Sequence, residues 1–287
     1  MPFPRRTMDS VTIQVPATSA NLGPGYDALG VALKIYNQVT VWRGRPEADL
    51  PPIVEKAAAL FFQTAGVQPF EFGWRIEGEV PQSRGMGSSV TVRLGVLHAL
   101  NELSCRPLGR EQLFALCSEL EGHPDNAAPA EFGGFTVANQ KSCLRFPVED
   151  RLRFVLLVPD FEVSTPEARK VLPKELPHAE AVKSAANAAR ITAAFAQGRY
   201  EALAGCFEDG LHQPFRLSLI PFLYDVIRAG EAAGAIGGFL SGSGSTIACV
   251  TLQHPEAVAD AMRKALPAGV EGYTIVTGVD NEGVKVV

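Results

Sequence analysis

Residues 81–90 read PQSRGMGSSV, and they decide how the sequence around them is interpreted. This stretch follows a segment whose apolar residues alternate as in a strand (residues 70–80), and it opens a segment with helical spacing (residues 88–103). Gly85 and Gly87 allow backbone conformations, and a close approach to a ligand, that side chains would block. A strand, a glycine-rich turn and a helix in this order form a candidate phosphate-binding loop.

Two interpretations of this loop stay open from its own residues. The unpaired N–H groups and the partial positive charge at the start of the helix suit a phosphate, and Ser88 and Ser89 can bind an oxygen or ligate a magnesium ion. An ordinary tight turn with serine caps needs the same residues. The loop is not a P-loop, because no lysine follows the glycines as in GxxxxGK[ST], and its spacing does not match the GxGxxG of a dinucleotide fold.

Two further glycine-rich loops favour the phosphate interpretation. Residues 19–30 read SANLGPGYDALG after the first predicted strand, and residues 241–246 read SGSGST between two predicted strands. Asn21 and Asp27 are polar residues that an ordinary turn does not need, although both types are common in turns. Three such loops in one chain indicate phosphate handling more strongly than one loop does.

The composition limits the class of protein. The chain has 287 residues, 46% of them hydrophobic and 20% charged, which is typical of a soluble globular protein with two domains or one large fold. The net charge of −5, from 26 basic and 31 acidic residues, argues against non-specific nucleic-acid binding. No apolar run reaches the roughly 18 residues of a membrane span, so we expect no membrane partner.

The N-terminal segment and the cysteines bear on the compartment. The segment MPFPRRTMDS contains two arginines but no apolar stretch follows them, which predicts a leader without fixed structure rather than a secretory signal. The five cysteines are widely spaced and include no CxxC pair, so we expect neither a disulfide framework nor a zinc ribbon. These features predict a cytoplasmic protein.

Strand and helix patterns mix without regular alternation, which predicts an α+β fold rather than a doubly wound parallel sheet. A boundary near residue 155 divides the chain into two predicted domains, residues 1–155 and 156–287. The first strand, residues 11–15, is expected to end at Pro16. The other predicted strands are residues 31–41, 70–80, 133–139, 154–158, 235–240, 246–252 and 273–277. The predicted helices are residues 53–65, 88–103, 110–120, 178–197, 200–208, 222–233 and 255–266.

The three loops also carry a resemblance to a known family. The segments VPATSANLGPGYDALG, PQSRGMGSSV and FLSGSGST resemble, in order, the three motifs of the GHMP small-molecule kinase superfamily. Within it, residues 119–135 (ELEGHPDNAAPAEFGGF), 164–173 (STPEARKVLP) and 213–221 (QPFRLSLIP) are similar to the homoserine kinases. The resemblance runs from about residue 11 to residue 249. It implies a two-domain α+β fold with an N-terminal domain like ribosomal protein S5 and a C-terminal ferredoxin-like domain.

The resemblance implies an activity and two cofactors. ATP would phosphorylate the γ-hydroxyl of L-homoserine, giving O-phospho-L-homoserine and ADP, a step of threonine biosynthesis. The phosphates of ATP would lie on the first loop, with Mg²⁺ held by Ser89 and Glu119. From the residues alone, Glu121 is an equal candidate for the metal. The expected ATP-binding residues are Pro81, Ser83, Arg84, Gly85, Met86, Gly87, Ser88 and Ser89.

The resemblance also implies a substrate site. Arg169 and Arg216 would clamp the α-carboxylate, because a guanidinium binds a carboxylate through two parallel hydrogen bonds. The other expected substrate residues are Asn21, Asp27, His123, Asn126 and Gly242, with Asn21 and Asp27 receiving the hydroxyl and ammonium ends. The expected catalytic residues are Asn21, Asn126, Ser89 and Glu119. Asn126 cannot act as a base, so we expect catalysis by alignment, with Asp125 as a structural acceptor.

Two alternatives stay open. One is a GHMP kinase that acts on another small alcohol, such as mevalonate or a sugar, and the other is an inactive ligand-binding member of the superfamily. Arg169, Arg216 and His123 argue against the first alternative, and the retained Ser89 and Glu119 argue against the second. Homodimers are common in the family, but no feature of this sequence establishes one. Likewise, no residue pattern here identifies the adenine pocket.

Overall fold

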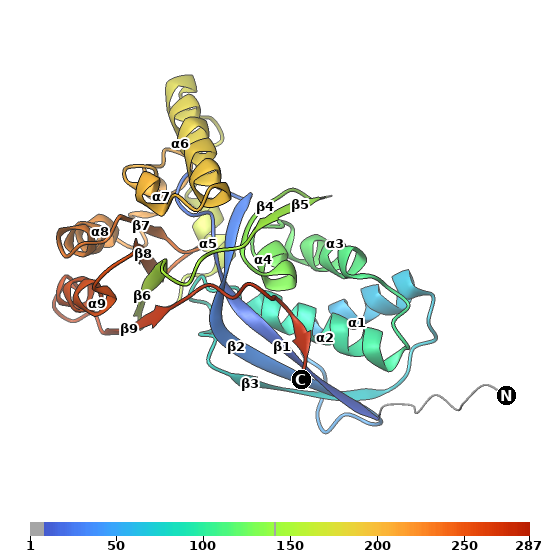
Figure 1. The fold of residues 1–287 in the computed structure, drawn as a ribbon. Helices are drawn as coiled ribbons and strands as arrows, with labels where there is room; N and C mark the ends of the chain where they lie inside the picture. Colours follow the sequence, from blue (N-terminus) through green and yellow to red (C-terminus); the bar gives the residue numbers. More distant parts are fainter. Residues whose placement is uncertain (1–8, 141) are drawn as a thin grey trace.

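The structure, a computed structural model, describes residues 9–140 and 142–287. The predicted N-terminal leader lies almost entirely outside the described residues. Two antiparallel sheets organise the chain: one has the order β10-β1-β2-β4-β5 with β3 also paired to β2, and the other has the order β7-β8-β6-β9 (Figure 1). This arrangement, with helices covering the sheets, confirms the predicted α+β class.

The strands are β1 (Ser10–Ala20), β2 (Leu29–Arg43), β3 (Phe72–Gly78), β4 (Phe135–Ala138), β5 (Cys143–Phe146), β6 (Arg153–Pro159), β7 (Gly237–Leu240), β8 (Ile247–Thr251), β9 (Gly272–Thr277) and β10 (Lys285–Val286). The helices are α1 (Pro52–Ala65), α2 (Ser88–Leu103), α3 (Arg110–Glu121), α4 (Ala127–Phe132), α5 (Thr165–Lys170), α6 (His178–Ala196), α7 (Gln213–Arg216), α8 (Leu223–Ala232) and α9 (Pro255–Lys264), with a 3₁₀ turn η1 (Tyr200–Leu203). The sequence analysis did not predict α4, α5, α7, β5 or β10, and the helix expected over residues 200–208 is only η1.

The first strand is longer than predicted, and the difference positions the site. β1 was expected to end at Pro16, but it continues to Ala20 beside β2. Its register shifts between Pro16 and Ala17, as at a bulge, where a proline is tolerated within a sheet. The prediction was therefore wrong, and the extra residues bring Thr18 and Ser19, both buried, to the end of the sheet where the loops meet.

Three apolar clusters hold the layers together. Helices α1 to α4 cover one face of the first sheet, and α2 packs on β1 and β2, where Gly95 lies against the side chain of Val39 (Figure 1). A second cluster lies between the two sheets and α6, and includes Phe135 stacked on Phe195 with ring centroids 4.1 Å apart. Helices α8 and α9 cover the outer face of the second sheet. The described residues include no helix long and apolar enough to cross a membrane.

The two sheets do not divide the chain at residue 155. A cut at that point would fall inside β6, all of which pairs within the second sheet. The chain passes from the first sheet to the second before Arg153, the first residue of β6. The chain also returns at its end, because β10 pairs with β1 through Ile13 and Val286. The C-terminal residues thus complete the first sheet rather than the second.

Candidate active site

One cavity of about 550 Å³ collects most of the predicted site residues. Those that line it are Asn21, Asp27, Ser83, Arg84, Gly85, Met86, Gly87, Ser88, Ser89, His123, Asn126, Arg169, Arg216 and Gly242. Two predicted residues do not line it, Pro81 and Glu119, although Val80 and Gln82 on either side of Pro81 do. The three glycine-rich loops of the sequence therefore meet at one site.

Hydrogen bonds join the three loops directly. The Ser241 hydroxyl donates to the Gly85 carbonyl at 2.7 Å and lies 2.8 Å from the Ser19 hydroxyl. The Thr18 N–H donates to the Met86 carbonyl at 3.1 Å. Each of these contacts links residues that lie far apart in sequence, so the loops form one rigid wall.

Gly85 and Gly87 are required by this close approach. Both have left-handed backbone angles, with φ of +72° and +70°. A Cβ at Gly85 would lie 2.1 Å from the Ser241 carbonyl oxygen, and one at Gly87 would lie 2.1 Å from the Thr18 hydroxyl. Any side chain would separate the loops or distort them. The predicted need for glycine at these two positions is confirmed for the backbone conformation and for the packing of the loops, and their role in phosphate binding stays a prediction.

The first turn of α2 is open to an anion. Its N-cap, Gly87, has no side chain to accept from the N–H groups of the turn, and no acidic residue lies in that turn. Ser88 and Ser89 line the cavity there. A helix N-terminus with free N–H groups and a partial positive charge binds phosphate well. By contrast, the Arg84 guanidinium turns away, donating to the Pro159 carbonyl at 3.0 Å.

An apolar slot continues the cavity beyond the first turn of α2. Ile53 at the start of α1, Trp74 and Ile76 on β3, and Val92 on α2 line it. The sequence analysis placed Trp74 and Ile76 on one face of a strand but not at a ligand site. Their alternation predicts burial on one face, and it cannot show that this face borders a cavity rather than a packed core.

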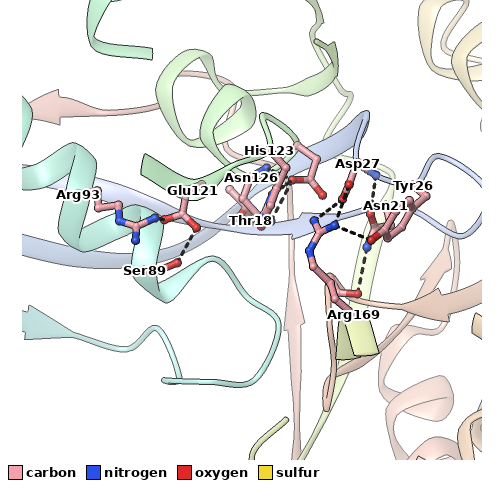
Figure 2. A network of polar contacts seen from close by, with 12 residues as sticks. Thr18, Asn21, Tyr26, Asp27, Ser89, Arg93, Glu121, His123, Asn126 and Arg169 are labelled. Atoms are coloured by element: carbon pink, nitrogen blue, oxygen red, sulfur yellow. Dashed lines mark hydrogen bonds and ion pairs between the residues drawn. The ribbon is translucent and has the colours of Figure 1, made fainter. Parts of the chain in front are cut away.

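Glu121, not Glu119, is the acidic residue beside Ser89. Glu119 is exposed on α3 and does not reach the cavity. Glu121 lines the cavity and accepts a hydrogen bond from the Ser89 hydroxyl at 3.0 Å (Figure 2). The prediction of Glu119 was wrong because two residues along a helix rotate a side chain by about 200°. Burial raises the pKa of Glu121, and the nearby Arg93 and the Ser89 hydrogen bond oppose that shift.

An ion pair closes the opposite end of the cavity. The Arg169 guanidinium donates to both carboxylate oxygens of Asp27, at 2.8 and 3.1 Å, and to the Tyr26 hydroxyl at 2.8 Å (Figure 2). Arg169 lies in the last turn of α5, which begins with a capping box between Ser164 and Glu167. Tyr26 was not predicted as a site residue, although it lies beside Asp27 in the second loop.

Arg216 lines the cavity and also ties its walls together. It is 2% exposed, and its Nε donates to the Ala168 carbonyl while Nη1 donates to the Gly242 carbonyl and to Nδ1 of His212. The other His212 nitrogen, Nε2, donates to the Gly23 carbonyl at 2.8 Å, so this imidazole is neutral with its proton on Nε2. Burial lowers the pKa of His212 to about 4. The sequence analysis missed His212, which stands directly before the QPFR segment.

The residues of the HPDN segment form a compact polar group. His123 Nδ1 lies 2.5 Å from an Asp125 carboxylate oxygen, and the same oxygen accepts from the Asn126 N–H at 3.0 Å. The Thr18 hydroxyl donates to the Asn126 side-chain oxygen at 2.7 Å. Burial favours neutral His123, but the hydrogen bond and charge of Asp125 prevail and raise its pKa. Asp125 is thus the buried acceptor that the sequence analysis expected.

Negative charge gathers at this end of the cavity. One ligand atom from each of Asp27, His123 and Asp125 lies within 4.8 Å of the others. The amide of Asn21 is occupied by the backbone, because it donates to the Gly242 carbonyl and accepts from the Asp27 N–H, both at 3.0 Å. The site therefore places the Arg169 guanidinium beside the carboxylates of Asp27 and Asp125. This arrangement suits a ligand that carries both a positive and a negative charge.

The chain matches known proteins over nearly its whole length. Residues 52–134 match the family described as GHMP kinases N terminal domain, and residues 191–268 match GHMP kinases C terminal. The fold and the loop-built site thus define a GHMP kinase, as the sequence resemblance implied.

Individual relatives narrow the class. A homoserine kinase of Thermus thermophilus is 38% identical over 95% of this chain and 97% of its own, and one of Clostridium beijerinckii is 36% identical over 96% and 98%. The crystal structure of homoserine kinase from Cytophaga hutchinsonii superposes with a TM-score of 0.90 at 26% identity, covering both chains in full. The protein belongs to the homoserine kinase family.

Proposed function

We propose that the protein transfers the γ-phosphoryl group of ATP to the γ-hydroxyl of L-homoserine, giving O-phospho-L-homoserine and ADP for threonine biosynthesis. One observation carries the proposal: a single cavity joins an apolar slot, an open helix N-terminus and a paired Asp27–Arg169 in this order. These three parts fit the base of a nucleotide, its phosphates and a zwitterionic amino acid.

The nucleotide occupies the half of the cavity between β3 and α2. The adenine lies in the slot beside Trp74, where an aromatic ring can stack on a base. The phosphates lie across Gly85 to Ser89 and accept from the N–H groups of the first turn of α2. The loop does not need a lysine for this, because backbone donors and the helix end supply the positive potential.

Ser89 and Glu121 suit a magnesium ion. Mg²⁺ prefers oxygen ligands and binds through one or two carboxylates together with phosphate oxygens and water. A hydroxyl and a buried carboxylate 3.0 Å apart, at the phosphate end of the cavity, provide such oxygens. When bound there, the ion would neutralise charge on the β- and γ-phosphates.

Asp27 and Arg169 recognise the α-ammonium and α-carboxylate of homoserine. The Arg169 guanidinium has further N–H groups beyond those that bind Asp27 and Tyr26, and these can bind a carboxylate. Asp27, with Asp125 nearby, supplies the negative charge for the ammonium. Arg216 faces the same pocket, but it also holds Gly242 and α5 in place. The ammonium group of a zwitterion can bind Asp27 while its carboxylate binds Arg169, whereas an alcohol with a single charge can bind only one of the two residues.

Phosphoryl transfer at this site depends on alignment. Asn126 lines the cavity, and its amide cannot remove a proton from the hydroxyl. The Asp125 carboxylate is 2% exposed and already accepts from its neighbours His123 and Asn126. The chain therefore holds the hydroxyl in line with the γ-phosphorus, and the proton leaves late to phosphate or water.

A coupled assay of ADP release tests the substrate class. The purified protein is given ATP and Mg²⁺ with L-homoserine, L-threonine, L-serine or mevalonate. We expect release of ADP with L-homoserine far above the other three. Equal rates with mevalonate would favour a GHMP kinase of another small alcohol, and no release with any acceptor would favour an inactive ligand-binding member.

We place the reaction in the cytoplasm, in keeping with five cysteines that are all free. Cys117, Cys206 and Cys249 are buried as small apolar residues. A homodimer stays a prediction from the family resemblance.

A further inference from the structure

Glu121 occupies an unfavourable place for a carboxylate. It is the last residue of α3, where the free carbonyl groups of the helix carry a partial negative charge. Its side chain is only 9% exposed, so water does little to stabilise its charge. A buried carboxylate in such a place is stabilised by a cationic partner held close to it.

Arg93 supplies such a partner. Its Nη1 lies 2.6 Å from Glu121 Oε1, while the Ser89 hydroxyl donates to Oε2 of the same carboxylate (Figure 2). Ser89 and Arg93 are four residues apart on α2 and therefore lie on the same face of that helix. One helix thus contacts both oxygens of Glu121: Oε2 accepts a hydrogen bond, and Oε1 lies in an ion pair without hydrogen-bond geometry. Together these two contacts orient the carboxylate at the cavity wall.

Arg93 acts only through Glu121. It does not line the cavity, and its side chain is 18% exposed. Within residues 9–140 and 142–287, its ion pair is with Glu121, and its buried Nε makes no hydrogen bond.

We infer that Arg93 is a positioning residue for the divalent cation: its ion pair with Glu121 Oε1 keeps the carboxylate oriented toward the Ser89 side of the cavity. This inference rests on the proposed role of Glu121 as a metal ligand. A guanidinium also repels a nearby cation, which acts in the opposite direction. Removal of a residue that orients a metal ligand weakens metal binding by about 10–100-fold, so positioning outweighs repulsion here.

Nucleotide binding with and without metal tests the inference independently of catalysis. Isothermal titration calorimetry gives the Kd of AMP-PNP in excess magnesium chloride and in excess EDTA, and the ratio of the EDTA value to the magnesium value measures the contribution of the metal. The variants are Arg93→Met, Arg93→Lys, Glu121→Gln and the double variant Arg93→Met with Glu121→Gln. Arg228→Met, an exposed arginine on α8, is the matched control.

We expect Arg93→Met to lower the ratio by about tenfold, Arg93→Lys to lower it less, and Arg228→Met to leave it unchanged. Glu121→Gln lowers the ratio, and adding Arg93→Met to it has no further effect, because Arg93 acts through that carboxylate. Thermal melting of each variant identifies any that fails to fold, and Arg93→Lys then serves as the test.

Two results would overturn the inference in different ways. If Glu121→Gln lowers the ratio but Arg93→Met and Arg93→Lys leave it unchanged or raise it, the positioning role fails and the metal site stands. If Glu121→Gln itself has no effect, both the metal role of Glu121 and the role of Arg93 are refuted. ATP binding remains a separate part of the proposed function, measured by the EDTA titration.

Discussion

Replacing Arg169 by methionine removes the guanidinium that faces Asp27 and keeps most of the volume of the side chain. Hydrogen bonds to charged groups contribute about 1.5–3 kcal/mol each, and two parallel bonds would bind the substrate carboxylate. The Arg169 side chain is 39% exposed, so solvent screening reduces this sum. We expect a loss of about 2–3 kcal/mol, which lowers kcat/KM for L-homoserine by about 30–150-fold.

Steady-state kinetics with two acceptors test this magnitude. The KM for ATP should change little, because Arg169 lies at the opposite end of the cavity from the nucleotide slot. With 3-aminopropan-1-ol, which is homoserine without its carboxylate, the variant should lose much less than it does with L-homoserine. Equal losses with both acceptors, or equal rises in the KM values of ATP and L-homoserine, would refute the carboxylate assignment.

Three other experiments test separate parts of the site. Glu121→Gln should lower kcat by about 100-fold or more, and Glu119→Gln should leave it unchanged; the reverse order in a steady-state assay would restore the original assignment. In a Trp42→Phe background, ATP should quench the fluorescence of Trp74, and a Trp42→Phe protein that binds ATP without any spectral change would exclude the adenine slot. His212 has a pKa near 4 when folded, below its usual 6.5. The unfolded chain therefore binds the extra proton first, and stability should fall by about 3 kcal/mol as the pH decreases from 6.5 to 4. Urea titrations should show a smaller fall for His212→Gln.

The glycine-rich loop before α2 could be predicted because it depends on local backbone conformation and close packing. Gly85 and Gly87 are needed wherever a backbone must turn with positive φ and approach another chain segment closely. Helix α2 begins and ends where the sequence pattern predicted, since a glycine-rich turn precedes it and its apolar spacing is regular. The same pattern predicted that Ser88 and Ser89 lie at the start of this helix.

The end of the cavity with Asp27 and Arg169 could not be predicted from local sequence patterns. Asp27 and Arg169 are 142 positions apart and meet only because the loop after β1 and the short helix α5, which follows β6 of the other sheet, converge. Both residues were predicted as substrate residues through the family resemblance alone, and their ion pair with each other was not predicted. Tyr26 and His212 were missed for the same reason, since an aromatic or histidine residue in a loop carries no local sign of its distant partner.

The errors at Glu119 and Pro16 have local causes. Two glutamates separated by one residue point in different directions on a helix, and only the glutamate next to the terminating Gly122 reaches the cavity. A proline normally ends a strand, but a register shift after Pro16 lets β1 continue. The spacing of residues does not fix which face of α3 borders the cavity, and it does not show where β1 changes its register.

Phosphorus NMR of the reaction mixture tests the central claim most directly. The protein is incubated with ATP, Mg²⁺ and L-homoserine, and the products are followed over time. We predict that a phosphate monoester signal, matching authentic O-phospho-L-homoserine, grows at the same rate as the signals of ADP. Formation of ADP with inorganic phosphate alone, or no consumption of ATP, would contradict the account.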